Sequence, residues 1–197
     1  MTSFQQGQWV NEPAVYAISD DALQVTTDAR TDFWRETHYG FIHDSGHLFA
    51  FEAADGFTAQ VRVRAQFEQL YDQAGIMVRV DERQWLKAGL EFSDGHAMLS
   101  RVRTVDRSDW ATGVYTGNPT DFWLRLSVDK GVLRLQVSTD GAEWPLVRLC
   151  PFPAADRNRN HYLVGPMCCT PERSGLQVTF SDWSLTQHLD KDLHDLT

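Results

Sequence analysis

The sequence predicts an all-β fold in which two antiparallel sheets pack face to face as a jelly-roll sandwich. Short segments alternate apolar and polar residues, turn residues separate them roughly every 8 to 12 positions, and no long apolar helical pattern occurs. The chain has 197 residues, of which 12% are aromatic, and this size suits one β domain with a large core. We expect this domain to span residues 1–187.

The expected strands follow from the two-residue period of a β-strand. The clearest alternation lies in residues 57–65, where Phe57 and Val61 would face the core and Arg62 would face outward. The same period marks the other expected strands, which are residues 14–19, 22–27, 75–80, 85–92, 95–104, 122–128, 133–137, 162–167 and 176–180.

Three segments lack a regular period. Residues 31–51 combine aromatic side chains with glycines and are predicted to form a loop-rich wall. Residues 105–121 are predicted to be a long loop with Trp110 near its middle. The charged tail, residues 188–197, is expected to be a frayed helix or disordered.

Charge and composition narrow the classes of partner. The net charge of −9 and the pI of about 5.1 argue against a nucleic acid, which needs an excess of clustered Lys and Arg. No apolar stretch is long enough for a membrane span, and the first residues lack a secretory signal. The cysteine count is odd, and adjacent Cys168 and Cys169 rarely form a structural disulfide. We therefore expect a reducing, cytoplasmic location.

The stretch from Tyr71 to Phe92 has the most informative pattern in the chain. Its two expected strands place apolar side chains on one face and a mixed set on the other, which comprises Met77, Arg79, Trp85, Lys87 and Glu91. An ordinary solvent face carries Thr, Ser, Lys and Glu, whereas Trp among Arg, Lys and Glu is typical of a concave, ligand-facing sheet. The pattern therefore predicts a binding face.

The alternation of side chains along the later strands adds further residues to this face. The candidate ligand-binding residues are Arg79, Trp85, Lys87, Glu91, Arg101, Arg103, Trp123 and Arg125, with Trp34 and Trp110 in loops at the rim. Trp rings stack on sugar rings, charged groups bind hydroxyls, and a local basic group would attract a carboxylate or phosphate. The alternative is that these residues occupy two different outer faces, with the Trp rings under loops and the charges solvated.

Histidines in the aromatic segment suggest a metal site at first sight. His38, His43 and His47 lie near Asp44, but their spacing matches no closed metal site, and no calcium-binding loop occurs. Hydrogen bonds within turns are the favoured account. We expect no metal and no other cofactor.

Three parts of the sequence together resemble a known family. They are residues 31–49, residues 71–95, and the short motifs at 108–110, 121–128 and 138–144. The chain resembles the uncharacterised concanavalin A-like lectin/glucanase family that includes a fungal regulation-of-enolase protein, and it is similar to accessory sandwich domains of β-xylosidases. The resemblance covers about residues 9–186. It implies a concanavalin A-like jelly roll whose concave face binds sugars in related families, but it implies no activity.

The positions of the Asp and Glu residues in the sequence do not favour a catalytic role. Glucanases with this fold carry a Glu-x-Asp-x-x-Glu strand, and that signature is absent. Glu91 and Asp94 lie three positions apart, so a regular strand would point them to opposite faces. A pair from separate strands, Glu91 with Asp109 or Asp121, stays open as an alternative.

The expected function is non-catalytic binding of a carbohydrate or another small, hydroxylated, neutral or anionic metabolite on the concave face. Two alternatives remain. One is a glycoside-active enzyme that uses Glu91, and the other is a metabolic regulator that contacts a glycolytic enzyme, as the family name suggests. The expected partners are therefore a small molecule or glycan and, in the last case, a protein, with no nucleic acid and no membrane.

Overall fold

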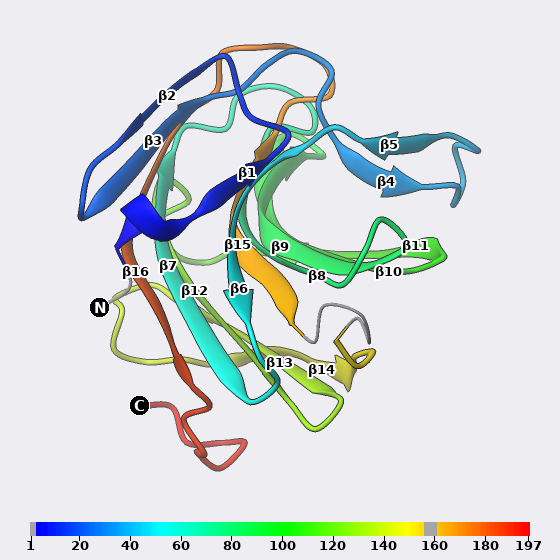
Figure 1. Ribbon diagram of the computed structural model, residues 1–197. Helices are drawn as coiled ribbons and strands as arrows, with labels where there is room; N and C mark the ends of the chain where they lie inside the picture. Colours follow the sequence, from blue (N-terminus) through cyan, green and yellow to red (C-terminus); the bar gives the residue numbers. More distant parts are fainter. Residues whose placement is uncertain (1–2, 156–160) are drawn as a thin grey trace.

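The computed structural model describes residues 3–155 and 161–197. Two seven-stranded antiparallel sheets form a sandwich, and a separate two-stranded hairpin projects beyond them (Figure 1). The described residues contain no α-helix, only a 3₁₀ turn at Phe4–Gln6. The predicted all-β sandwich is therefore confirmed.

The two sheets and the hairpin are defined by their strand order. Sheet A runs β1 (Gln8–Val10), β6 (His47–Ala53), β15 (Tyr162–Cys169), β8 (Gln73–Arg79), β9 (Gln84–Ser93), β10 (His96–Val105) and β11 (Arg107–Val114). Sheet B runs β14 (Leu146–Pro151), β13 (Val132–Ser138), β12 (Asp121–Asp129), β7 (Phe57–Ala65), β16 (Gln177–Gln187), β3 (Ala22–Thr26) and β2 (Val15–Ile18). The hairpin pairs β4 (Phe33–Arg35) with β5 (Ile42–Asp44).

The main core lies between the inner faces of the two sheets. The alternation expected for residues 57–65 and 122–128 holds, since Val61, Val63, Phe122 and Leu124 are fully buried. Residues of sheet A such as Ile76 pack against them in the same cluster. Burial of apolar surface at about 25 cal/mol per Å² stabilises this arrangement.

A second apolar cluster covers the opposite, outer face of sheet A. Its members come from the hairpin and from the sheet beneath it, and they are Phe33, Trp34, Leu48, Ala50, Met77, Trp85, Val102, Met167 and Cys169. Sheet A is therefore buried on both faces where the hairpin lies over it. This explains why β8 and most of β9 are buried on both sides.

Two expectations about irregular segments were wrong. Within residues 31–51, β6 is a regular strand that pairs with both β1 and β15. Within residues 105–121, β11 pairs with β10 from Met98↔Val114 to Val105↔Arg107. Both segments lack clean alternation, because β6 is buried on both faces along most of its length and β11 is mostly exposed.

Sheet A bends sharply beneath the hairpin (Figure 1). Within this sheet, Gly75 of β8 lies directly opposite Gly89 of β9. A Cβ atom on Gly89 would collide with the carbonyl oxygen of Ala74, and one on Gly75 would collide with that of Ala88. Glycine at both positions lets the backbones of β8 and β9 approach closely.

The tail begins where β16 ends, at Gln187. Residues 188–197 contain no helix, unlike one of the two forms expected for them. Arg134 of β13 donates hydrogen bonds to the carbonyls of Lys191, Leu193 and Asp195. These contacts hold the tail against the outer face of sheet B.

The described residues include no helix that is long and apolar enough to cross a membrane.

Candidate ligand-binding site

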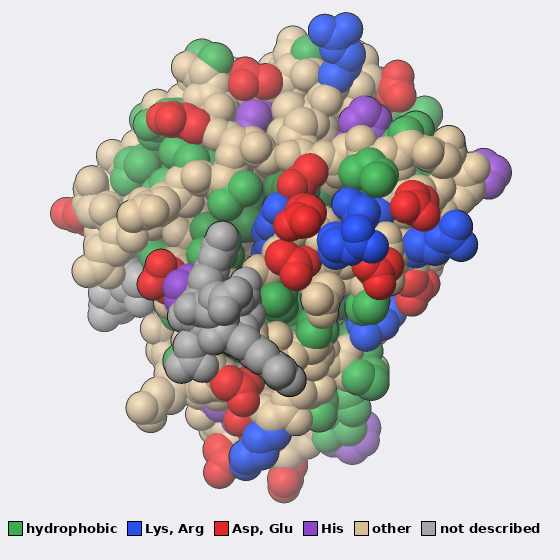
Figure 2. Space-filling view, turned by 45° about the vertical axis from the view of Figure 1, so that its right-hand side comes forward, with side chains coloured by type: hydrophobic (Ala, Val, Ile, Leu, Met, Phe, Trp, Pro, Cys, Tyr) green, Lys and Arg blue, Asp and Glu red, His purple; other side chains and the backbone are tan. Residues whose placement is uncertain are grey.

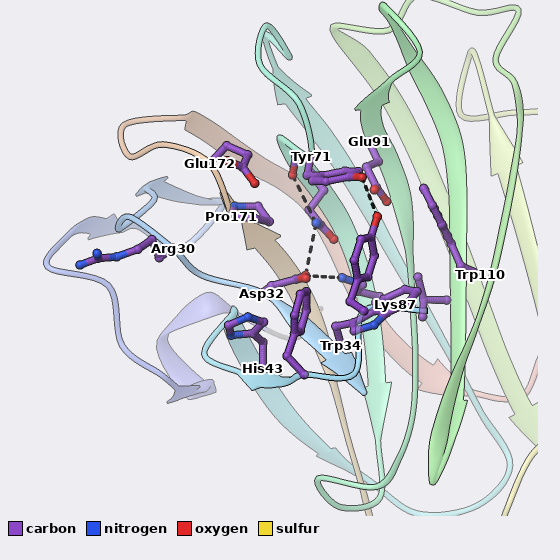
Figure 3. Close-up of a pocket in the computed structure, with 14 residues that line it drawn as sticks. Arg30, Asp32, Trp34, His43, Tyr71, Lys87, Glu91, Trp110, Pro171 and Glu172 are labelled. Atoms are coloured by element: carbon purple, nitrogen blue, oxygen red, sulfur yellow. Dashed lines mark hydrogen bonds and ion pairs between the residues drawn. The ribbon is translucent and has the colours of Figure 1, made fainter. Parts of the chain in front are cut away.

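A cavity of about 320 Å³ lies between the concave face of sheet A and the β4–β5 hairpin (Figure 3). Its lining comes from the hairpin, from strands β8 to β11 and from three loops. The lining residues are Arg30, Asp32, Trp34, Tyr39, Phe41, His43, Tyr71, Gln73, Lys87, Glu91, Val102, Trp110, Pro171 and Glu172. Aromatic walls with a few buried polar groups are the usual make-up of a small-molecule site.

Lys87 and Asp32 form an ion pair at the base of the cavity. The Lys87 Nζ atom donates to the Asp32 Oδ1 atom over 2.7 Å, and both side chains are largely buried. Burial alone would lower the pKa of Lys87, but the charge of Asp32, the other acidic groups nearby and the hydrogen bond to Asp32 together outweigh burial, so the pKa is raised. Lys87 therefore stays charged at neutral pH, and its charge is matched within the protein.

Glu91 lies beside this pair and has a different environment. Its side chain is buried and accepts one hydrogen bond from the Ser100 Oγ atom over 2.6 Å. Burial raises the pKa of Glu91, and this outweighs the opposing effects of Lys87 and Ser100. A carboxyl group with a raised pKa in an apolar site can donate a hydrogen bond as well as accept one.

Four aromatic residues, Trp34, Tyr39, Tyr71 and Trp110, form a closed circuit that we call the aromatic box. Ring centroids are 5.8 Å apart for Trp34 and Tyr39, 6.2 Å for Trp34 and Trp110, and 6.3 Å for Tyr71 and Trp110. The angles between these ring planes are 69°, 90° and 74°. A hydrogen bond of 2.9 Å between the hydroxyls of Tyr39 and Tyr71 closes the circuit.

Hydrogen bonds hold the hairpin over sheet A. The Arg79 Nη2 atom donates to the Asp44 Oδ2 atom over 2.9 Å, and the backbone N–H of Arg35 donates to the Ser108 Oγ atom over 2.9 Å. The indole N–H of Trp34 bonds the carbonyl of Thr37 within the hairpin. The hairpin side of the cavity is thus preformed.

A buried ion pair anchors the two loops that form the other side. Asp72 is fully buried, and its Oδ1 atom accepts a hydrogen bond of 2.8 Å from the Arg173 Nε atom. The Asp72 Oδ2 atom also accepts from the backbone N–H groups of Glu68 and Gln69. Tyr71 adopts a positive φ of 63°, which is unusual for a bulky residue and is held by these contacts of its neighbour.

The structure brings four of the ten predicted residues into the cavity, namely Trp34, Lys87, Glu91 and Trp110. Arg79 and Trp85 lie on the predicted face, since Arg79 pairs with Trp85 and Met77 with Lys87 across β8 and β9. However, Trp85 is only 1% exposed and packs against Phe33, so its ring is not accessible to a ligand. Arg79 lies beneath the hairpin, outside the lining.

Arg101 and Arg103 do not share this face, so their predicted placement was wrong. They lie opposite Ala88 and Leu86, whose side chains point into the sandwich core. Val102 instead faces the cavity, because the hairpin creates a second apolar environment there. The Arg103 Nε atom donates to the carbonyl of Pro151.

Trp123 and Arg125 belong to the other sheet, so their grouping with Lys87 was also wrong. They alternate with the buried Leu124 and therefore lie on the outer face of sheet B. The guanidinium of Arg62 lies 4.4 Å from the Trp123 ring, and that of Arg125 lies 3.8 Å from a second indole ring. The alternative expectation, that the candidate residues occupy two different outer faces, is therefore correct for Trp123 and Arg125.

Sequence reasoning missed most of the cavity wall. The missed residues are Arg30, Asp32, Tyr39, Phe41, His43, Tyr71, Gln73, Val102, Pro171 and Glu172. The aromatic content of residues 31–51 signalled a wall, but nothing in the sequence showed that it folds over β9. Glu172 and Pro171 lie in a loop about 80 residues from Glu91, and no local pattern links them.

The charges around the hairpin occur in pairs. Arg83 pairs with Asp106 and Arg107 pairs with Glu36, in addition to Arg79 with Asp44. Figure 2 shows Lys and Arg side chains next to Asp and Glu side chains on this side of the molecule, and no basic patch stands out in this view. The expected attraction for an anionic ligand thus loses its main support.

The histidines occupy separate environments. His47 is buried; its Nε2 atom accepts from the backbone N–H of Asp28, so its Nδ1 atom must donate to the carbonyl of Asn11. His43 lines the cavity and packs against Phe41. Over residues 3–155 and 161–197, no group of three His, Cys, Asp or Glu side chains is arranged to hold a metal ion.

Comparison with solved structures supports the same architecture. A crystal structure described as a functionally unknown protein from Saccharomyces cerevisiae has a TM-score of 0.91 and 60% identity, covering 95% of this chain and 100% of that chain. A GH43 protein from Bacillus licheniformis has a TM-score of 0.67 and 16% identity, covering 93% of this chain and 37% of that one. A xylan β-1,4-xylosidase from Bacillus halodurans gives a TM-score of 0.64 at 12% identity, covering 94% of this chain and 38% of that one. At such low identity the last two show a shared fold alone.

Sequence comparison identifies the family. A Saccharomyces cerevisiae protein named Regulation of enolase protein 1 is 62% identical over 198 residues, which cover 100% of this chain and 97% of the yeast protein. Residues 9–188 match the family described as Protein of unknown function (DUF1349). This range includes every strand of the sandwich except part of β1. The chain belongs to the DUF1349 family.

Proposed function

We propose that the chain is a non-catalytic binding protein for a small hydroxylated molecule, such as a carbohydrate, and that the cavity beneath the hairpin is its binding site. The observation that carries the proposal is the combination of aromatic walls with three polar side chains at the base of the cavity, the buried Lys87 and Glu91 and the largely buried Asp32. Aromatic rings bind the C–H faces of a sugar, and buried polar groups bind its hydroxyls. A site already folded in this way loses little entropy on binding.

The charge balance narrows the ligand to a neutral or cationic molecule. Lys87 is matched by Asp32, while Glu91 and Glu172 add acidic groups to the lining. An anion placed here would meet carboxyl groups without a free cation at the base. The proposal therefore replaces the anionic option with a neutral or positively charged ligand.

Substitution of Glu91 tests the binding proposal. Glu91→Ala is expected to weaken binding of a monosaccharide or polyol by about tenfold, because one hydrogen bond worth about 1.4 kcal/mol is lost. The measurement is calorimetric titration against a panel of hydroxylated compounds, with circular dichroism as the check on folding.

Arg103→Ala is the matched control, because Arg103 was expected on the same face but lies on the opposite one. Its affinity should equal that of the unchanged protein. Equal weakening by both substitutions, or binding that survives Glu91→Ala unchanged, would contradict the proposed site. Turnover of any glycoside in the panel would favour the enzyme alternative over binding.

A second candidate function is regulation of an enolase through direct contact. The name of the yeast relative favours it, and the tip of the hairpin exposes apolar side chains that suit a protein contact. Ile42 is 50% exposed and Phe41 is 41% exposed at this tip. The two candidates are compatible, because Phe41 belongs to both the tip and the cavity lining.

Enolase turnover with and without the purified protein tests this second candidate. A change in turnover is expected, together with binding that Ile42→Asp weakens by about tenfold, because a charge would be buried in the contact. Val114→Asp is the control, since Val114 is 78% exposed on β11, outside the hairpin. Unchanged turnover and no detectable binding would exclude the candidate.

A further inference from the structure

The aromatic box has a shape that distinguishes it from an ordinary sugar platform. A pyranose stacks on one open aromatic face. Here Trp34, Tyr39, Tyr71 and Trp110 follow one another at steep angles of 69° to 90° and close into a circuit. Such an enclosure suits a compact, nearly spherical group that contacts several rings at once.

Acidic groups lie next to the box. The hydrogen bond with Tyr39, together with burial and the nearby charges of Tyr39, Glu91 and Glu172, raises the pKa of Tyr71 to about 12. Glu91 and Glu172 line the same cavity as Tyr71, and Figure 3 shows both side chains near the Tyr71 ring. A cation inside the box would be attracted by these carboxyl groups and by the faces of the rings.

The basic side chains that line the cavity do not compete with a ligand cation for the aromatic box. Lys87 is held by Asp32 through the contact of 2.7 Å. Arg30 lines the cavity, but Figure 3 shows its side chain directed away from Tyr71 and Trp110. The aromatic box therefore combines ring faces with acidic neighbours, and the lysine of the lining is already paired with Asp32.

We propose that the aromatic box binds an alkylated ammonium group, and that the ligand of the cavity is a small hydroxylated molecule carrying such a group. This inference rests on the proposed function, since it assigns a chemical class to the ligand of the same cavity. Alkylated ammonium groups are weakly hydrated, so they enter an aromatic enclosure at a smaller desolvation cost than a primary amine. The hydroxyl would reach Glu91 or Gln73 at the base of the cavity.

A pair of probes that differ only in charge tests the inference. Choline carries a hydroxyl and a trimethylammonium group, and 3,3-dimethyl-1-butanol replaces the nitrogen with carbon at nearly the same shape. We expect choline to bind about tenfold more tightly, as a cation–π attraction of about 1.4 kcal/mol predicts. Trp110→Leu should reduce this preference to about twofold or less, because it removes one ring of the box.

Trp123→Leu is the matched control, because Trp123 is a partly exposed tryptophan on the outer face of sheet B. It should keep the full preference for choline. Equal affinity of the two probes for the unchanged protein, a preference that survives Trp110→Leu, or no binding of either probe would each overturn the inference.

The panel of neutral sugars and polyols separates this inference from the proposed function. If a neutral compound binds and Glu91→Ala weakens it while choline has no advantage, the binding function stands and the ammonium assignment fails. If choline, its neutral analogue and the whole panel all fail to bind, both proposals fail.

Discussion

Gly89→Ala is expected to destabilise the protein by about 3 kcal/mol, at the upper end of the usual cost of overpacking. The added Cβ atom would meet the carbonyl carbon of Ala74, 2.7 Å away, and the Cα atom of Gly75, also 2.7 Å away. Neither atom can move without displacing β8 from β9. Urea denaturation followed by tryptophan fluorescence measures the effect as a lower midpoint at an unchanged slope.

Gly113→Ala is the control for this prediction. A Cβ atom on Gly113 would lie 3.7 Å from its nearest neighbour, the Nη1 atom of Arg101, so it fits without strain. Gly113→Ala should be neutral or slightly stabilising, because alanine restricts the unfolded chain. Similar stability of the two variants would show that the close approach of β8 and β9 at Gly89 tolerates a Cβ atom, contrary to this prediction.

The fold was predictable because its strands bury one face each in a shared core. Alternation at residues 57–65 and 122–128 matches β7 and β12 to within one residue at each end. It failed at β6 and β11 for a physical reason. β6 has apolar environments on both sides along most of its length and β11 is largely exposed, so neither leaves a two-residue signature in the sequence.

The candidate site was predictable only in part. The two-residue alternation of a strand shows which side chains share a face, but it does not show which sheet the strand joins. Lys87 and Glu91 were placed correctly, since their neighbours in β9 carry an unambiguous core face. Trp123 has the same parity pattern but lies in sheet B. Arg101 and Arg103 alternate with Val102, and Val102 packs in the cluster on the outer face of sheet A, so the two arginines lie on the face opposite to the predicted one.

Asp32 shows a further limit of the sequence. It lies 55 positions from Lys87, and only the fold of the hairpin brings the two side chains together. Once they meet, the charge of Lys87 is no longer available to attract an anionic ligand. One contact that sequence reasoning could not foresee therefore changes the class of ligand that the cavity suits.

Arg173→Ala is expected to cost about 3 kcal/mol, which is typical of removing one partner of a buried ion pair. It would leave the Asp72 carboxylate fully buried and supported only by the backbone N–H groups of Glu68 and Gln69. The double variant Asp72→Asn with Arg173→Ala should recover part of the loss, because it removes the buried charge. Urea denaturation of both variants at neutral pH provides the measurement.

The same ion pair predicts a dependence on pH with a definite sign. Burial raises the pKa of Asp72, but the hydrogen bonds from Arg173 and from the N–H groups of Glu68 and Gln69 outweigh burial, so the pKa is lowered on folding. A lowered carboxyl pKa stabilises the fold above the unfolded value of about 4, and this contribution is lost as the pH falls through the folded value.

Acidification should therefore narrow the stability gap between the unchanged protein and Arg173→Ala. Without Arg173, burial would favour the protonated form of Asp72. Lowering the pH would therefore raise the free energy of unfolding of the variant while it lowers that of the unchanged protein. Arg107→Ala is the control, because the Arg107 side chain is 76% exposed and its contact with Glu36 is screened by water. A gap of the same size at pH 7 and near pH 4 would show that Asp72 stays ionised without its partner, and that the loops beside Tyr71 are held by packing rather than by this charge.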